Sequence, residues 1–352
     1  MLDYLIVGLG LAGIAFCEKL EEGRKTFKVI NDDSQTSSNI AGGLYNPVIL
    51  KRFSLAWKAD QQLQMAYPFY KNLEAKLGVS LDNKIAVLRI FASVEEQNMW
   101  FEAADKPKLK PYLSTKLVQN TNSCIKAPYG FGEVLHTGRV DTKRLVDAYS
   151  LYLSSRKQLY AETFNFEDLE ITETGIKYKS IKAKKIVFAT GFGLKSNPYF
   201  NYLPLNGTKG ELLTIRAPLL KENRVIKSSV FIIPVGHDLF RIGATYKWKD
   251  KTNVPTPEAR EELQRKLDTF LNCDYEVVKH VAGIRPTVAD RRPLVGRHPK
   301  YKSLYMLNGF GSRGVMIAPY ASNQLYNFIE NNVPVAPEMD IGRYLKAYAN
   351  PQ

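Results

Sequence analysis

The sequence predicts an α/β fold in which a parallel sheet and an antiparallel sheet alternate along the chain. Three apolar segments have the continuous pattern of strands buried in a parallel sheet, at residues 3–7, 27–30 and 185–191. Between and after these segments the pattern favours antiparallel structure. The clearest case is a hairpin in which 231–234 and 239–246 flank a Gly-His-Asp turn. In a chain of 352 residues, this interleaving indicates two domains, each built from separate segments.

The first 31 residues form a predicted β-α-β unit, because strand 3–7 leads directly into Gly8-Leu-Gly-Leu-Ala-Gly13 and then into a helical pattern. Gly8 permits a tight turn, Gly10 lets the backbone approach a pyrophosphate, and Gly13 lets the helix pack closely on the strand. The pyrophosphate then lies at the positive end of the helix, beside Leu11 and Ala12. The motif therefore predicts a Rossmann-like dinucleotide site, against the alternative of a glycine-rich turn without a ligand.

The second strand of such a unit should end in an acidic residue that binds the ribose hydroxyls. Asn31 occupies this register and Asp32 follows it, so the acid is either displaced by one position or replaced by an amide. We expect Asp32 to bind the ribose. No neighbouring arginine is placed to receive a 2′-phosphate, which disfavours NADP.

The remaining elements follow from apolar periodicity and from capping residues. Helices are predicted at 55–78, 95–104, 141–153, 258–271 and 314–330, and further strands at 85–91 and 303–307. Asp141 or Thr142 should cap the third of these helices. Pro319 lies close to the start of the last one, where its missing N–H costs little. If that helix began well before Gly314, Pro319 would instead produce a kink.

Composition and charge limit the classes of protein to which this chain can belong. A hydrophobic fraction of 45% and a charged fraction of 24% exclude a disordered or fibrous chain. The 3 cysteines and 4 histidines show no metal-ligand spacing, so we expect no metal site and a reducing compartment. The longest apolar run, 4–16, is too short to span a bilayer, so we expect a soluble, cytoplasmic protein. The net charge of +14 favours binding to a nucleic acid or another anionic partner. The alternative is that the basic residues are simply exposed to solvent.

Motifs in a fixed order resemble those of a known family. They lie at 8–13, 37–44, 189–191, 283–296 and 308–319, and the last two contain Gly-Ile-Arg-Pro and Gly-Phe-Gly-Ser-Arg-Gly. Together they resemble the FAD-dependent D-amino-acid oxidase superfamily, which includes glycine oxidase and sarcosine oxidase. The resemblance implies a Rossmann-like FAD-binding domain and an α+β substrate domain on the antiparallel sheet. We expect the former at 1–60, 135–205 and 283–345, and the latter at 61–134 and 206–282.

The resemblance also implies which residues hold FAD. The pyrophosphate and the edge of the flavin would contact Ser37, Ser38, Gly42, Gly43 and Leu44. The adenosine half would lie near Ala189, Thr190 and Gly191. The isoalloxazine ring would lie along Phe310, Gly311, Ser312, Arg313, Gly314 and Val315, where a helix N-terminus stabilises negative charge. For segment 37–44 the alternative is an ordinary glycine turn. For segment 189–191 it is a buried strand that needs glycine for close packing. The matching motifs hold no cysteine or histidine for covalent attachment, so non-covalent FAD is expected.

Arg285 is the candidate substrate ligand. In the family, the arginine of the Gly-x-Arg-Pro motif holds the substrate carboxylate by a bidentate pair, which a planar guanidinium fits. The alternative is a structural ion pair with a local acid such as Asp290.

The hairpin at 239–246 resembles the strand above the flavin, which makes Arg241 and Tyr246 candidate catalytic residues. Alternation places Arg241, Gly243 and Thr245 on one face of the strand and Ile242, Ala244 and Tyr246 on the other. Only one of these faces can then contact the flavin. Tyr45 and Lys209 are weaker candidates of the same kind.

The resemblance implies an enzyme that oxidises the C–N bond of an amino acid or N-substituted glycine. Hydride would pass from the substrate to flavin N5, and water would hydrolyse the resulting imine. The alternative is a flavoenzyme of tRNA modification. Gly-Gly-Leu-Tyr at 42–45 and the motif at 309–314 also resemble the FAD domain of the tRNA 5-methylaminomethyl-2-thiouridine biosynthesis enzyme, whose methyltransferase half does not occur in this chain. Its carboxymethylaminomethyl substrate group is itself an N-substituted glycine, and the net charge of +14 suits tRNA. A flavin-binding protein without turnover and a nicotinamide enzyme are further alternatives.

Overall fold

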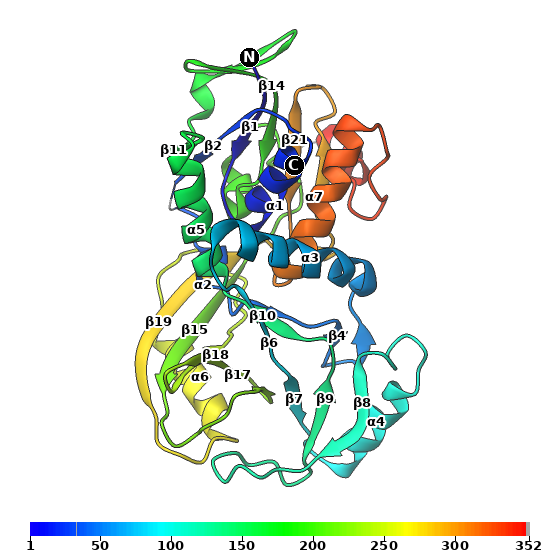
Figure 1. Ribbon diagram of the computed structural model, residues 1–352, viewed down its shortest axis with the longest axis vertical. Coiled ribbons are helices and arrows are strands. Elements are labelled where there is room, and N and C mark those ends of the chain that lie inside the picture. Colours follow the sequence, from blue (N-terminus) through cyan, green and yellow to red (C-terminus); the bar gives the residue numbers. More distant parts are fainter. Residues whose placement is uncertain (33, 350–352) are drawn as a thin grey trace.

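The computed structural model describes residues 1–32 and 34–349, and Figure 1 shows two sheets stacked along its long axis. The first sheet, in the upper part of the figure, has parallel strands at its centre. In spatial order they are β11 (Leu159–Ala161), β2 (Phe27–Asn31), β1 (Leu2–Val7), β14 (Ile181–Phe188) and β21 (Leu304–Asn308). The N-terminal strand therefore pairs with a strand from the middle of the chain, in the register Leu2↔Ala183 to Val7↔Phe188.

Antiparallel strands and two helical layers complete this half of the molecule. The added strands are β13 (Gly175–Tyr178), β12 (Leu169–Thr172) and β20 (Leu294–Arg297). The helices α1 (Leu11–Glu22), α5 (Thr142–Ser155) and α7 (Gly314–Glu330) pack on one face of the sheet (Figure 1). The opposite side has its own apolar core, in which Phe188 packs with Phe164, Phe166 and Phe200.

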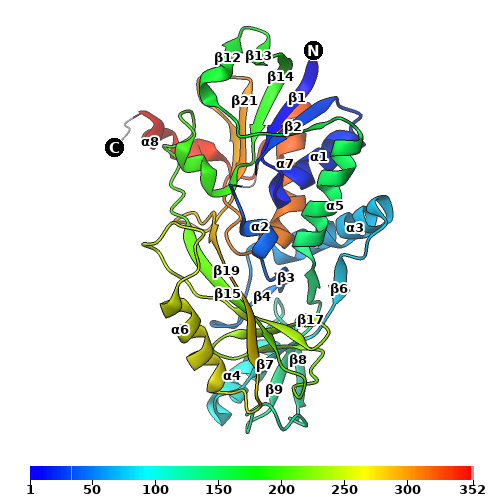
Figure 2. The same ribbon diagram turned by 90° about the vertical axis from the view of Figure 1, so that its left-hand side faces the viewer.

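The second sheet occupies the lower part of the molecule and is mostly antiparallel (Figure 2). Its strands, in spatial order, are β19 (Glu276–Arg285), β15 (Thr208–Arg216), β18 (Leu239–Gly243), β17 (Phe231–Gly236), β16 (Val225–Lys227), β7 (Val87–Ile90), β9 (Phe131–Val134) and β8 (Leu113–Val118). Only the pair β16 and β7 runs parallel within the described residues. Helices α6 (Pro257–Asp268) and α4 (Val94–Ala104) pack against this sheet.

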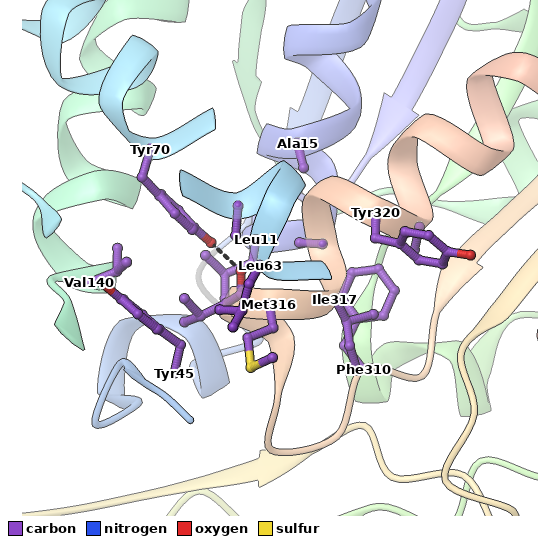
Figure 3. Close-up of a cluster of buried hydrophobic side chains, with 14 of the residues drawn as sticks. Leu11, Ala15, Tyr45, Leu63, Tyr70, Val140, Phe310, Met316, Ile317 and Tyr320 are labelled. Atoms are coloured by element: carbon purple, nitrogen blue, oxygen red, sulfur yellow. Dashed lines mark hydrogen bonds between the residues drawn. The ribbon is translucent and has the colours of Figure 1, made fainter. Parts of the chain in front are cut away.

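Helix α3 (Ala59–Leu77) lies between the two sheets (Figure 1) and packs against α7 (Figure 3). Pro319 lies inside α7, so it offers no N–H to the carbonyl oxygen of Val315, four residues earlier. The buried hydroxyl of Tyr70, on α3, donates to that oxygen at 2.8 Å. A residue of α3 therefore completes the hydrogen bonding of α7 where proline interrupts it.

Short elements connect these layers. They are α2 (Ser37–Ile40), β3 (Leu44–Tyr45), β4 (Val48–Ile49), β5 (Ser54–Leu55), β6 (Asp82–Lys84), β10 (Gly138–Val140), the 3-10 turns Phe166–Asp168, Gly191–Ser196 and Ile341–Tyr344, and α8 (Leu345–Ala349). Strand β10 pairs with β3 and β6, and β4 pairs with β5. No helix within residues 1–32 and 34–349 combines the length and hydropathy needed to cross a membrane.

The predicted α/β class, with one parallel and one antiparallel sheet, is confirmed. Asp141 caps α5 as predicted, and α7 has the predicted bounds. The predicted helix at 55–78 was too long, because Leu55 belongs to β5 and Lys58 has a left-handed φ of 47°. The predicted strand 239–246 was also too long, because β18 ends at Gly243. Beyond it, Lys247 forms an isolated bridge with Lys209 of β15.

The predicted division into two domains remains a prediction. Both sheets are built from separate segments of the chain, as the interleaved pattern indicated. One element lies across the predicted division: α3 falls mostly in segment 61–134, yet it packs on α7 of segment 283–345. Its apolar face and the helices of the first sheet share one continuous core.

Candidate functional site

A cavity of about 1060 Å³ lies where the carboxyl ends of the central parallel strands face the second sheet. Val7 at the end of β1 and Ile30 in β2 line it from one side. Leu212 in β15, Ile233 in β17 and Arg285 in β19 line it from the other. Ligands of open α/β sheets bind at the carboxyl ends of parallel strands, where the strand order reverses. The cavity therefore has the position expected for a dinucleotide.

The glycines of the N-terminal motif bring strand, helix and a neighbouring strand into close approach. Gly8 has a φ of +100°, and a Cβ there would lie 2.6 Å from the carbonyl oxygen of Ala189. A Cβ on Gly13 would lie 2.0 Å from the carbonyl oxygen of Gly8. Gly10 begins α1 without a side-chain cap and lines the cavity with Leu11 and Ala12. The uncapped helix N-terminus can therefore bind a phosphate, while Gly13 acts through packing and does not line the cavity.

The two candidates for ribose binding have different roles. The side-chain oxygen of Asn31 accepts a hydrogen bond from the backbone N–H of Leu9 at 2.8 Å, so this amide holds the glycine turn. The carboxylate of Asp32 lines the cavity and accepts hydrogen bonds from Ser34. Burial raises the pKa of Asp32, but hydrogen bonds from Ser34 and Thr163 outweigh it and lower the pKa below its usual value. Asp32 is therefore ionised at neutral pH and free to accept from hydroxyls.

The predicted pyrophosphate loop forms the part of the cavity wall next to α1. Its lining residues are Ser37, Ser38, Gly42, Gly43 and Leu44. The hydroxyl of Ser38 accepts from the N–H of Leu11 at 3.3 Å, which joins the loop to the start of α1. A Cβ on Gly43 would lie 1.9 Å from the carbonyl oxygen of Val140, so this glycine is required by packing as well.

Arg241, predicted as a catalytic candidate, lies behind the loop and does not line the cavity. Its guanidinium donates to the carbonyl oxygens of Ile40 and Ala41 at 2.8 and 2.7 Å. Burial, together with the nearby charge of Arg139, lowers the pKa of Arg241. The arrangement makes Arg241 a support of the loop, and nothing places it against a substrate.

The C-terminal motif forms another wall of the cavity. Its lining residues are Phe310, Gly311, Ser312, Gly314 and Val315. No side chain caps α7 at Arg313, so its N-terminus offers backbone N–H groups and the positive end of the helix dipole toward the cavity. Arg313 itself points away, and its guanidinium donates to the carbonyl oxygen of Asn46 at 2.9 Å. Burial lowers the pKa of Arg313.

Arg285 lies at the cavity wall, where its guanidinium contacts Thr245 and Tyr246. One Nη donates to the carbonyl oxygen of Thr245 at 3.3 Å, and the guanidinium carbon lies 5.5 Å from the centre of the Tyr246 ring. Within residues 1–32 and 34–349 no carboxylate pairs with Arg285. Asp290, the alternative partner, pairs with Arg343 at 3.0 Å. Burial lowers the pKa of Arg285.

Tyr246 lines the cavity and is 45% exposed, so it lies at the cavity opening. Its ring packs edge-on against Trp248, with the ring centres 5.3 Å apart. Gly243 and Ala244 line the cavity as well. Residues assigned to both faces of the strand therefore line the cavity, because the twofold alternation ends where β18 ends. Which of them contacts the flavin stays a prediction.

The two weaker candidates lie away from the cavity. Lys209 is fully buried and binds acceptors between Asp250 and Val254. The hydroxyl of Tyr45 donates to Asp82 at 2.8 Å, and burial raises the pKa of Tyr45. Both side chains have structural partners that account for their positions.

Several cavity residues were not predicted from the sequence. They include Ser34, Gln35, Asn39, Val146, Asp147, Ser150, Glu162, Thr163, Phe164, Gly210, Leu212, Phe231 and Ile233. Those at 162–164 follow β11, which pairs in parallel with β2. A parallel assignment for β11 would have located them, because ligands gather at the carboxyl ends of parallel strands.

The family of this chain follows from its match to a family model. The model of the FAD dependent oxidoreductase family, DAO, matches residues 3–325. This chain belongs to that family. The resemblance inferred from the motifs is therefore confirmed, and FAD is the cofactor of the family.

Curated relatives are similar over parts of their length. Glycine oxidase of Bacillus subtilis (strain 168) is 28% identical over 225 residues, which are 58% of this chain and 60% of that protein. The tRNA 5-methylaminomethyl-2-thiouridine biosynthesis bifunctional protein MnmC of Legionella pneumophila (strain Corby) is 21% identical over 376 residues, 95% of this chain and 55% of that protein. The chain thus spans less than two thirds of each of these two relatives.

Solved structures of the same fold match nearly the whole chain. Glycine oxidase from Bacillus cereus ATCC 14579 aligns with a TM-score of 0.76 at 22% identity, over 95% of this chain and 96% of that one. Iminodiacetate oxidase (IdaA) from Chelativorans sp. BNC1 aligns with a TM-score of 0.78 at 16% identity, over 97% and 98% of the two chains. At these identities the likeness shows the fold.

The cavity residues fit FAD on their own geometry. Asn39 Oδ1 and Thr190 Oγ1 are buried side-chain oxygens without a hydrogen-bond partner among the described residues, and both residues line the cavity. Buried polar atoms are seldom left unpaired, so they indicate a polar ligand. The glycines at 8 and 10 leave the backbone bare where a pyrophosphate would approach. The described cavity lining holds no cysteine or histidine.

Proposed function

We propose that this protein oxidises the C–N bond of an amino acid or N-substituted glycine, and that Arg285 binds the substrate carboxylate. The observation that carries the proposal is the guanidinium of Arg285, which is half-buried in the cavity wall and has no acidic partner within the described part of the chain. A partly desolvated cation without a counter-charge attracts an anion, and a bound carboxylate would supply that charge. The planar guanidinium suits a bidentate pair with a carboxylate.

The surroundings of Arg285 favour a small substrate with an apolar or minimal side chain. Leu212, Phe231 and Ile233 line the cavity from the second sheet, and they exclude water from its wall. Tyr246 and Arg285 would fix the orientation of the substrate, which is the main contribution of the protein in such chemistry. When bound, FAD supplies the hydride acceptor. The α7 N-terminus would stabilise negative charge developing beside it.

The lining contains no candidate general base near Arg285. No histidine, lysine or cysteine lines the cavity among the described residues, and the acids that do, Asp32, Asp147 and Glu162, belong to the end near β2, α5 and β11. The proposed reaction starts from a neutral amine and needs no side-chain base. The similar proteins named glycine oxidase and iminodiacetate oxidase also favour glycine or an N-substituted glycine as the substrate class.

A second candidate function is oxidation of an N-substituted glycine carried on tRNA. The exposed aromatic pair Tyr246 and Trp248 at the cavity opening favours it, because aromatic rings stack on unpaired bases. Lys247 and Lys249 alternate with this pair, and exposed lysines there would contact phosphates. Lys247 also pairs with Glu262 at 2.7 Å. The similarity to MnmC, a bifunctional protein of tRNA 5-methylaminomethyl-2-thiouridine biosynthesis, agrees with this candidate.

Anaerobic bleaching of the FAD absorption band tests the proposal. Glycine, sarcosine, iminodiacetate, D- and L-amino acids and tRNA with the modified wobble base would each be added to the purified holoprotein. We expect bleaching by glycine or an N-substituted glycine. Bleaching by tRNA alone, lost after nuclease treatment and at high salt, would favour the second candidate.

The role of Arg285 is tested with Arg285→Met and with Arg216→Met as the control. Arg216 is a surface arginine at the far end of β15. Loss of a buried partner of a charge pair costs 2 kcal/mol or more, so the half-saturating substrate concentration of Arg285→Met should rise at least about 30-fold. FAD content should not change. Equal half-saturation in Arg285→Met and wild type would refute the assignment.

A further inference from the structure

The segment 244–256, between β18 and α6, forms part of the cavity opening. It carries Tyr246, which lines the cavity, and its Thr245 carbonyl oxygen accepts from Arg285. Further along, Asn253 donates to the carbonyl oxygen of Ser34 at 3.2 Å, and Ser34 lines the cavity beside Asp32. The segment thus contacts both the proposed substrate ligand and the side of the cavity formed by the first sheet.

A fully buried lysine holds the outer part of this segment. Lys209 in β15 is 0% exposed, and its ammonium donates to Asp250, to the hydroxyl of Thr252 and to the carbonyl oxygen of Val254. Lysine is almost never fully buried unless it is paired. These three acceptors all belong to the segment. The segment therefore provides the hydrogen-bond partners of the buried ammonium, and these bonds hold residues 250–254 in place.

A buried glutamate two residues away holds both ends of the segment. Glu211 is 1% exposed, and its carboxylate accepts from the N–H and hydroxyl of Thr256 at 2.8 and 3.1 Å. It also lies 2.9 Å from Nε2 of His280 and 3.5 Å from Nζ of Lys209. At the other end, the N–H of Glu211 donates to the hydroxyl of Thr245 at 3.0 Å.

Strand β15 joins these contacts to Arg285 through the alternation of its side chains. Lys209 and Glu211 point toward the segment, while Gly210, between them, faces the guanidinium of Arg285. Backbone hydrogen bonds also join Lys209 to Lys247, and the N–H of Thr245 to the carbonyl oxygen of Glu211. The same two residues of β15 therefore hold both the outer part of the segment and its start, where Thr245 and Tyr246 contact that guanidinium. Neither Lys209 nor Glu211 lines the cavity, so their effect on a ligand must act through other residues.

We propose that Lys209 and Glu211 are positioning residues for substrate binding, which anchor segment 244–256 and thereby hold Thr245 and Tyr246 against Arg285. The proposal rests on the proposed function only in that Arg285 is taken as the carboxylate ligand. The anchoring itself does not depend on the reaction, so the two parts can be tested separately.

Limited trypsin digestion of the holoprotein tests the anchoring. Lys247, Lys249 and Lys251 are exposed cleavage sites within the segment. Lys209→Met should increase the rate of cleavage after these lysines at least about tenfold, because a loosened segment enters the protease more readily. The matched control is Arg224→Met, which removes a cation paired with the buried Glu222 just before β16. It should leave cleavage in the segment unchanged.

Glycolate, a carboxylate without an amine, tests the consequence for binding. Its dissociation constant is measured from the perturbation of the FAD absorption band. We expect Lys209→Met to raise it about tenfold, because small displacements of a binding constellation are costly, while Arg224→Met and the FAD content stay as in wild type. Asp250→Asn is a second variant, for use if Lys209→Met does not fold. It should keep the fold because the Asp250 side chain is 37% exposed. It should shift both readouts in the same direction by a smaller factor.

The outcomes separate the anchoring from the proposed function. Unchanged cleavage in Asp250→Asn and Lys209→Met would overturn the anchoring. Faster cleavage with an unchanged glycolate constant would overturn the positioning role. If Arg285→Met binds glycolate as wild type does, the proposed function fails, while faster cleavage in Lys209→Met would still support the anchoring.

Discussion

A Cβ atom on Gly210 would lie 2.1 Å from Nη2 of Arg285, so the missing side chain of Gly210 provides the space that the guanidinium occupies. Gly210→Ala should therefore displace Arg285 from the cavity wall. We expect the half-saturating concentration of a carboxylate substrate to rise about 100-fold, which is typical of a misplaced binding group. Titrations of FAD bleaching measure it. Gly193→Ala is the control, because a Cβ there meets no atom closer than 3.5 Å although Gly193 lines the same cavity. Equal effects of the two substitutions would contradict this role of Gly210.

Tyr70→Phe should destabilise the protein by about 1–3 kcal/mol, because it leaves the buried carbonyl oxygen of Val315 without a donor. Urea unfolding, followed by circular dichroism, measures the change in free energy of unfolding. Tyr67→Phe on the same helix is the matched control, since that hydroxyl donates to the carbonyl oxygen of His136 at an exposed site. Its removal should cost much less. Equal costs would show that the bond to Val315 does not compensate for Pro319.

Arg241→Met should weaken the binding of FAD rather than the binding of substrate. The substitution removes two charge-assisted hydrogen bonds to the loop that carries Ser37 to Leu44. We expect the dissociation constant of FAD to rise at least about tenfold, since one such bond contributes about 1.5–3 kcal/mol. Fluorescence titration of the apoprotein with FAD measures it, with Arg216→Met as the control. An unchanged FAD constant with weaker substrate binding would instead support the contact with substrate that the sequence indicated for Arg241.

The shifted pKa of Lys227 determines whether the free energy of unfolding rises or falls with pH. Burial, with Arg89 and Lys266 nearby, lowers the pKa of Lys227 from 10.5 to about 8. Between these values the unfolded chain carries a proton that the folded protein lacks, so the free energy of unfolding rises with pH. For one proton the slope is at most about 1.4 kcal/mol per pH unit. The free energy of unfolding of wild type minus that of Lys227→Met should therefore increase from pH 7.5 to pH 10.

The control for this dependence is Lys182→Met, which changes an exposed lysine of the first sheet. Its difference from wild type should stay constant over the same range of pH. Parallel curves for wild type and Lys227→Met would mean that the ammonium of Lys227 is not destabilised by burial.

The sequence predicts best those parts of the site in which backbone geometry requires a residue type. The motif at 8–13 and the start of α7 at Gly314 are of this kind, because a tight turn, a close approach or a helix start restricts the residues that fit. The fold class follows equally well from the buried pattern of β1, β2 and β14. In these elements local sequence and tertiary structure agree.

Residues whose role depends on a distant contact could not be predicted in this way. Arg241 was placed on the correct strand, but its long side chain reaches past the cavity to the loop at Ile40. The lining face of α5 was missed because periodicity shows which residues are buried and not what they bury. The partners of Lys209 lie about forty residues away, at Asp250 to Val254, in a segment without regular structure.

The position of β14 between β1 and β21 has a consequence for synthesis on the ribosome. Strand β1 can pair with β2 early, but it gains its second neighbour only after residues 183–188 have left the ribosome, and β14 gains β21 only after residues 304–306 have done so. Until then the nascent chain exposes apolar edges of an incomplete parallel sheet, a condition that favours aggregation. Chains truncated before residue 304 lack β21 and α7, and with them one wall of the cofactor cavity. Such fragments should accumulate as insoluble, colourless protein.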